Sequence, residues 1–99
     1  MDFKYEDEYV KKHLSKQAIW GQLFEELGEM QHHAIKIQRI LDRENPTPCN
    51  LNDEMLECEK EWNDVLNCVR LLDIHHDETE MKCKMIRWWH RLKQKVEGS

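Results

Sequence analysis

The sequence predicts an all-α protein: an antiparallel helical bundle of about four helices, in a single domain of residues 1–99 that we expect to be oligomeric. Only three Gly and two Pro interrupt the chain, and apolar residues recur at helical spacing along most of it. No segment keeps the alternation of apolar and polar residues that is typical of a strand. Four Trp are more apolar surface than the thin core of such a short chain covers. This excess favours contact with another subunit.

Helical periodicity delimits four segments, at about Glu6–Leu14, Lys16–Arg43, Asp53–Ile74 and Glu78–Val96. Between the second and the third, residues 44–50 contain Asn-Pro and Thr-Pro, which disfavour helix. Side chains suited to capping precede three of the segments: Ser15, Asn50 or Asn52, and Asp77 with Glu80 in an acidic capping box.

The two longest segments each carry an apolar stripe with polar residues along one border. The stripe of the first comprises Ile19, Leu23, Leu27, Met30, Ala34, Ile37 and Leu41, and that of the second Leu51, Met55, Cys58, Trp62, Val65, Val69 and Leu72. The borders comprise Gln22, Glu26, Glu29, His33 and Lys36 on the first, and Glu57, Glu61, Asp64 and Cys68 on the second. We expect both borders to flank the packed seam, where a functional site in a helical bundle lies.

Two carboxylate pairs are the most informative feature of these borders. Glu26 with Glu29, and Glu61 with Asp64, are each three residues apart and so share one face of a helix. Four carboxylates converge if the two helices face each other, and such a cluster repels itself unless a cation is present. Oxygen ligands suit Mg²⁺, with Mn²⁺ as a substitute, so we predict a metal site. The alternative is that these acids merely solvate the helix surface.

Charge and composition exclude several other classes of protein. A net charge of −5 argues against a general nucleic-acid binder, although the end of the chain from Met81 is basic. No signal-peptide core and no run of about 18 apolar residues is present, so we expect a cytoplasmic protein without a membrane partner, its cysteines reduced. Cys83 and the neighbouring His lack zinc-ligand spacing. The ExxH unit from Glu29 to His32 lacks the second copy that a di-iron site needs.

The acidic segments carry a family resemblance. Residues Glu25-Glu26-Leu27-Gly28-Glu29-Met30, followed by Ala34 and Lys36, resemble the EExxE segment of the MazG-type all-α nucleoside triphosphate pyrophosphohydrolases. Residues Glu61-x-x-Asp64, followed by Val65-Leu66, resemble the ExxD segment of that family. The resemblance covers about residues 15–75. The spacer from Met30 to Lys60 is longer than is usual in the family, and little matches beyond Leu72.

The resemblance implies hydrolysis of a (deoxy)nucleoside triphosphate to the monophosphate and pyrophosphate, as house-cleaning of nucleotide pools, by a homodimer or homotetramer. Mg²⁺ would be held by Glu26, Glu29, Glu61 and Asp64, and either Glu25 or Glu26 would orient the attacking water. The runner-up is a non-catalytic acidic helical module that self-associates through its Trp-rich last helix.

Residues that would bind the substrate are less sharply defined. Lys36 follows Glu29 by two helical turns and can reach a phosphate, and Arg39 is a weaker candidate. Trp20 can stack on a base, with Phe24 and Trp62 as further options, although all three are also explained by core packing. In the last segment three basic residues can reach the triphosphate or serve a structural role: Lys84, Arg87 and Arg91.

Overall fold

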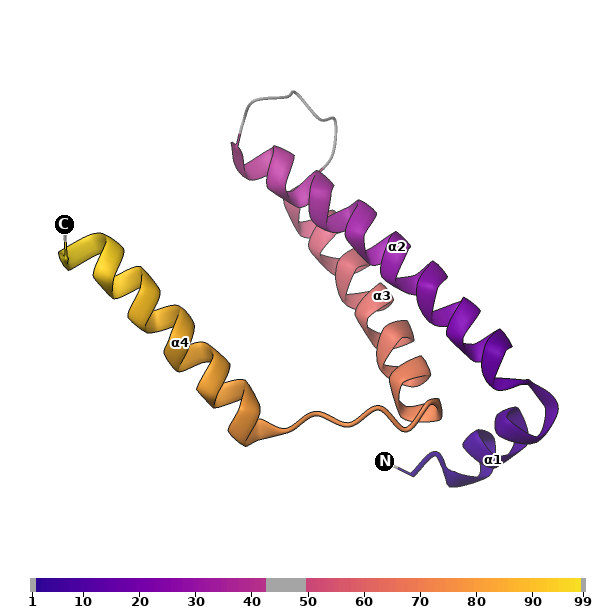
Figure 1. Cartoon of the computed structure of the whole chain (residues 1–99). Helices are drawn as coiled ribbons and strands as arrows, with labels where there is room; N and C mark the ends of the chain where they lie inside the picture. Colours follow the sequence, from indigo (N-terminus) through magenta and orange to yellow (C-terminus); the bar gives the residue numbers. More distant parts are fainter. Residues whose placement is uncertain (1, 43–49, 99) are drawn as a thin grey trace.

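The computed structural model describes residues 2–42 and 50–98, and all regular structure in these ranges is α-helical (Figure 1). The helices are α1 (Lys4–His13), α2 (Lys16–Asp42), α3 (Leu51–Leu71) and α4 (Glu78–Glu97). The all-α prediction is therefore confirmed, with the elements in the predicted order. The predicted end of α2 at Arg43 and the Pro-containing break at 44–49 lie outside the described residues.

Capping side chains fix where α2 and α3 begin. The backbone N–H of Ala18 donates to Ser15 Oγ at 3.1 Å, as the sequence predicts for the start of α2. Asn50 Oδ1 accepts from the N–H groups of Asn52 at 2.8 Å and Asp53 at 3.3 Å. Of the two predicted alternatives, Asn50 and Asn52, it is therefore Asn50 that caps α3. The helix begins at Leu51, slightly earlier than predicted.

The connection from α3 to α4 is defined by two local hydrogen-bonding motifs. Asp73 has a positive φ of 55°, and the N–H of Ile74 reaches back to the carbonyl of Val69 at 3.0 Å. This is the left-handed ending of a helix in which glycine is the usual residue. Asp77 then caps α4 by accepting from the N–H of Glu80 at 3.1 Å. α3 therefore ends before Ile74, and one half of the predicted capping box is formed.

α2 and α3 pack against each other along most of their length (Figure 1). The seam positions alternate at spacings of three and four: Ile19, Leu23, Glu26, Met30, His33, Ile37 and Ile40 on α2, and Leu51, Glu54, Cys58, Glu61, Val65 and Cys68 on α3. Leu23, Val65 and Cys68 form the buried cluster. The seam thus includes three glutamates and one histidine, which a typical helix-packing stripe does not.

The predicted apolar stripes match the observed packing only in part, because residues along one edge of each stripe are exposed. Five predicted stripe residues are exposed, namely Leu27, Ala34 and Leu41 on α2 and Met55 and Trp62 on α3. Glu26, His33, Glu61 and Cys68, predicted at the border, lie in the seam instead. Each helix is rotated so that its polar border faces the other helix. The apolar residues on the opposite border remain uncovered in the single chain.

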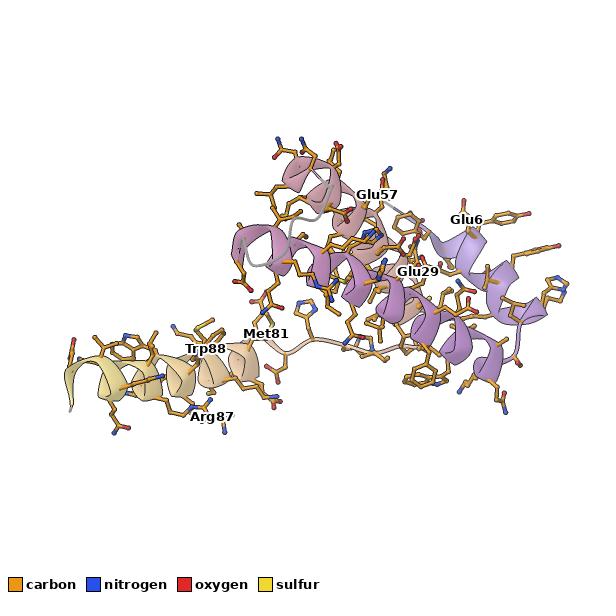
Figure 2. All side chains as sticks on the ribbon, turned by 90° about the horizontal axis from the view of Figure 1, so that it is seen from above. Glu6, Glu29, Glu57, Met81, Arg87 and Trp88 are labelled. Atoms are coloured by element: carbon orange, nitrogen blue, oxygen red, sulfur yellow. The ribbon has the colours of Figure 1, made fainter. Side chains whose placement is uncertain are left out.

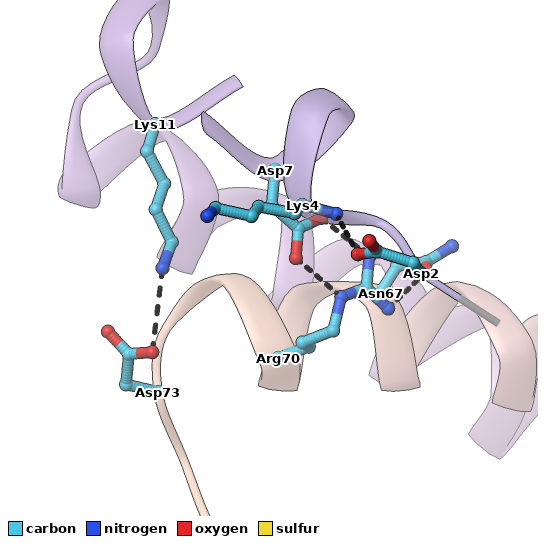
Figure 3. A network of polar contacts seen from close by, with 7 residues as sticks. All are labelled: Asp2, Lys4, Asp7, Lys11, Asn67, Arg70 and Asp73. Atoms are coloured by element: carbon cyan, nitrogen blue, oxygen red, sulfur yellow. Dashed lines mark hydrogen bonds and ion pairs between the residues drawn. The ribbon is translucent and has the colours of Figure 1, made fainter. Parts of the chain in front are cut away.

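Hydrogen bonds and ion pairs join α1 to the end of α3 (Figure 3). Arg70 donates from Nε and Nη2 to the two carboxylate oxygens of Asp7 at 2.8 and 2.9 Å, and its guanidinium lies 4.3 Å from the ring centre of Phe3. Paired bonds of this kind are strong and directional. The hydrogen bond and charge of Arg70 lower the pKa of Asp7, and Asp7 in turn raises that of Arg70. A weaker pair joins Lys11 to Asp73 at 3.5 Å.

α4 stands apart from the α2–α3 pair (Figure 1). None of its residues is buried, and the radius of gyration is 18.1 Å. A compact domain of this length has a radius of about 13 Å. The single chain is therefore more extended than a compact domain of its length, with α4 outside the α2–α3 pair. Among residues 2–42 and 50–98, no helix has the length and apolar character needed to cross a membrane.

Candidate metal centre

Three carboxylates from α2 and α3 meet at the middle of the helix pair. One oxygen from each of Glu26, Glu29 and Glu61 lies within 4.8 Å of the other two. Glu26 and Glu61 occupy seam positions and are half-buried, whereas Glu29 lies one turn further along α2 and is exposed. The structure thus brings together three of the four predicted metal ligands. The fourth, Asp64, follows Glu61 by one turn and interacts electrostatically with Glu26 and Glu29.

The protonation of this cluster reflects its crowding. Hydrogen bonding with the Glu26 carboxyl favours the protonated form of Glu61, and partial burial and the charge of Glu29 act in the same direction. Together they raise the pKa of Glu61 from 4.5 to about 7. Burial, followed by the charges of Glu26 and Glu29, raises the pKa of Asp64. Burial also raises the pKa of the nearby Cys68 thiol, and the charges of Glu26 and Asp64 contribute. The cluster therefore holds a proton in about half of the molecules near pH 7, because its negative charges are uncompensated.

The hydrogen bonding around these carboxylates is incomplete. Gln22 Nε2 donates to Glu26 Oε1 at 2.7 Å and so orients that side chain. The second oxygen of Glu26 and one oxygen of Glu61 are enclosed, and apart from the proton that these two carboxyls can share, no donor among the described residues reaches them. Enclosed polar atoms normally have a partner, because losing water without one costs about 1–3 kcal/mol. A cation between the two helices would supply that partner.

The donor set fits Mg²⁺. All candidate ligands are carboxylate oxygens, the atom type that this ion prefers, and they come from two helices that converge on one point. Oxygens on opposite sides of one Mg²⁺ lie about 4.2 Å apart, which is twice the usual Mg–O distance. The spacing within 4.8 Å is close to this value, so small side-chain rotations bring the oxygens into range.

The other predicted site residues lie at varying distances from the cluster. Glu25 is exposed and, with Glu29 and His32, lines a shallow recess on the outer side of α2. Trp20 precedes Glu29 by nine residues, which places it about 180° around the helix. Its side chain is exposed there, on the side of α2 that faces away from Glu29. The structure therefore brings Glu25 beside the cluster but not Trp20.

The two predicted phosphate-binding cations also lie away from the cluster. Lys36 Nζ is 3.9 Å from Glu54 Oε1, so this lysine pairs with an acid of the seam. Arg39 is exposed and follows Glu26 by 13 residues, or about 20 Å along the helix axis. Phe24 and Trp62, the further options for stacking, are exposed as well.

A buried polar contact between Glu54 and His33 was not anticipated from the sequence. Glu54 has only 8% of its surface exposed, and its Oε2 lies 2.7 Å from Nδ1 of His33. The sequence predicts His33 as a border residue that supports the ligands of the metal site, and it gives no role to Glu54. A signal was nevertheless present: Glu54, Cys58, Glu61, Val65 and Cys68 follow the alternating spacing of four and three that marks a helix-packing seam.

No family model, curated protein or solved structure matches this chain.

Proposed function

We propose that this chain is a Mg²⁺-dependent hydrolase that converts (deoxy)nucleoside triphosphates to the monophosphate and pyrophosphate, and that it serves to clear nucleotide pools. One observation carries the proposal: carboxylate oxygens from Glu26, Glu29 and Glu61 converge, and two of the enclosed oxygens lack a donor among the described residues. The resemblance of residues 25–30 and 61–66 to the acidic segments of the MazG-type pyrophosphohydrolases supports the reaction type.

Glu26, Glu29, Glu61 and Asp64 would hold Mg²⁺, and Mn²⁺ would substitute for it. When bound, the ion supplies the positive charge that triphosphate oxygens need during cleavage of the bond between the α- and β-phosphates. The protein must in addition hold a water molecule and accept its proton. We assign this role to Glu25 or Glu26.

Their surroundings distinguish these two glutamates. Glu26 is half-buried, held by Gln22 and adjacent to Glu61, so its oxygens are committed to the cluster. Glu25 is the residue before Glu26 on the same helix, and its side chain is exposed. Glu25 is therefore the better candidate to orient a water that approaches from solvent. Of the predicted substrate-binding residues, Lys36 and Arg39 would reach the phosphates only after side-chain movement. Trp20 would need a substrate bound across the opposite face.

The test is pyrophosphate release from a panel of ribo- and deoxyribonucleoside triphosphates, with Mg²⁺ and with a chelator. We expect Mg²⁺-dependent pyrophosphate with the monophosphate as the other product. Glu61→Gln and Asp64→Asn should each abolish turnover while leaving the helical circular dichroism unchanged. Glu57→Gln is the matched control, since Glu57 lies one turn before Glu61 and pairs with Lys60 at 3.0 Å. Orthophosphate as the product, or full activity in the Glu61 variant, would contradict the assignment.

A second function is favoured by a different observation. α4 buries none of its residues, and Trp88 and Trp89 are both exposed. This suits a non-catalytic module that self-associates, and we propose in either case that the working form is a homodimer or homotetramer completing an antiparallel bundle. Metal dependence separates the two functions. A ligand at a hundred times its dissociation constant stabilises a protein by about 2.7 kcal/mol, so an unchanged melting temperature in Mg²⁺ and nucleotide would favour the interaction module.

A further inference from the structure

α4 is an amphipathic helix that is not packed within its own chain. Figure 2 shows its side chains, among them Met81, Arg87 and Trp88, projecting around a ribbon that is separate from the other helices. Trp88 exposes 61% of its surface. Tryptophan carries the largest apolar surface of any side chain and is costly to leave in water. A 20-residue helix with such side chains needs a partner.

Five apolar residues of α4 follow one stripe, namely Met81, Met85, Trp88, Leu92 and Val96, whereas Ile86 and Trp89 lie to one side of it. Basic residues lie along the edge of this stripe. Lys84 and Arg91 stand four residues before Trp88 and three residues after it, so both lie one turn away on the same side of the helix. A partner surface must therefore offer an apolar recess for the indole and an acidic residue at its rim.

The α2–α3 pair offers such a surface on the side opposite the metal centre. Met30 of α2 and Met55, Cys58, Glu59 and Trp62 of α3 line an apolar recess of about 310 Å³. Trp62 is itself 47% exposed. It precedes Asp64 by two residues and so lies about 200° from it around α3. A helix seated in this recess would leave the carboxylate cluster open to solvent.

Charge favours a second copy of this chain as the occupant. Residues 81–98 contain six basic residues and one acid, a net charge of +5, and the whole chain carries −5. Residues 1–80 therefore carry −10. An anionic membrane would attract α4 but repel the rest of the molecule, whereas a second copy presents a surface of the sign opposite to α4. The lengths also agree, because α4 has 20 residues and α3 has 21.

We propose that α4 docks on the α2–α3 pair of a second copy, with Trp88 in the recess beside Trp62 and with Lys84 and Arg91 facing Glu59. The exchange is reciprocal in a two-fold dimer, so each chain both gives and receives an α4 helix. The interface does not depend on the proposed catalytic activity. It rests on the self-association proposed above, and because its test measures association and not turnover, the interface and the catalytic activity can fail separately.

Sedimentation of the full chain over a wide concentration range tests the interface. We expect a dimer whose dissociation constant rises at least about tenfold in Trp88→Ala, as for a buried aromatic anchor, and rises with salt. Trp89→Ala is the matched control. Trp89 is adjacent, lies about 100° around the helix, and already contacts His90 and Lys93 within its chain. We expect it to change the dissociation constant by less than about threefold.

A charge exchange locates the recess independently of aromatic packing. Glu59→Arg should weaken the dimer, as should Lys84→Glu combined with Arg91→Glu, and the triple variant should recover most of the affinity. Failure of the triple variant to recover affinity would contradict the assigned pairing. A chain that is monomeric at all concentrations would overturn the proposal. So would a dimer unaffected by Trp88→Ala, or a monomer that binds anionic phospholipid vesicles through Trp88.

Discussion

Mg²⁺ binding should weaken as the pH falls, because Glu61 must lose a proton to become a ligand. Its pKa is raised to about 7 by Glu26, partial burial and Glu29. A carboxyl with this pKa is protonated in about nine-tenths of molecules at about pH 6 and in about one-tenth at about pH 8. Since only the ionised form binds the cation, the apparent dissociation constant for Mg²⁺ should rise about tenfold between these two values. The raised pKa of Asp64 acts in the same direction.

Isothermal titration calorimetry at both pH values, in buffers of different ionisation enthalpy, measures the affinity and the protons released. We expect release of nearly one proton per Mg²⁺ at about pH 6 and almost none at about pH 8. In Glu61→Gln the release should disappear and binding should weaken, whereas Glu57→Gln should behave as the parent protein. Tight Mg²⁺ binding that is independent of pH and releases no proton would refute the role of Glu61.

The metal-free protein should show the corresponding dependence of stability on pH. A folded-state pKa above the unfolded value means that the folded protein holds the proton more tightly. The free energy of unfolding should therefore fall as the pH rises from about 4.5 to about 7, the interval between the unfolded and folded pKa values of Glu61. Saturating Mg²⁺ should remove this decline, because the ion replaces the proton. Chemical unfolding followed by circular dichroism, with and without chelator, measures both effects.

Two substitutions elsewhere test the packing. Glu54→Gln should lower the free energy of unfolding by about 1–2 kcal/mol, because it replaces the short contact between the Glu54 carboxylate and His33 by a neutral hydrogen bond. An unchanged urea midpoint would mean that this pair contributes nothing to stability. Asp73→Gly should raise the free energy of unfolding by about 0.5–1 kcal/mol, since glycine adopts the positive φ of 55° without strain. Asp73→Ala gives the contrast, and a gain equal to that of Gly would exclude the backbone explanation.

The helices and their caps could be predicted from the sequence because they depend on local interactions. Asn50 and Asp77 bind backbone N–H groups two or three residues away, and the chemistry of that bond is visible in the sequence. The convergence of Glu26 with Glu61 was also accessible, since each acid pair shares a helix face with its neighbours. These predictions required only helical geometry and one reversal of the chain.

Which face of each helix is turned toward the other could not be predicted in the same way. Ile19, Leu23, Met30 and Ile37 fit two stripes equally well: one continues through Leu27, the other through Glu26. Periodicity favours the stripe with more apolar residues. A helix with a single neighbour, however, buries only the part of its surface that faces this neighbour, and we call this part the buried arc. In the single chain the buried arc contains Glu26, and Leu27 remains 44% exposed. The position of α4 was equally inaccessible, because none of its residues is buried against the other described helices.

Both departures from the predicted packing have the same physical consequence. The described chain buries only four apolar side chains, Ile19, Leu23, Val65 and Cys68, and its seam holds carboxylates that repel each other. Carboxylates this close together repel each other most strongly when all of them are ionised. A cation reverses the sign of this contribution, and a second chain covers the apolar arc and the stripe of α4. Because ligands that bind only the folded state add to its stability, metal binding and association then contribute directly to folding. The folded form of this protein is therefore expected to depend on what it binds at two opposite faces of the α2–α3 pair.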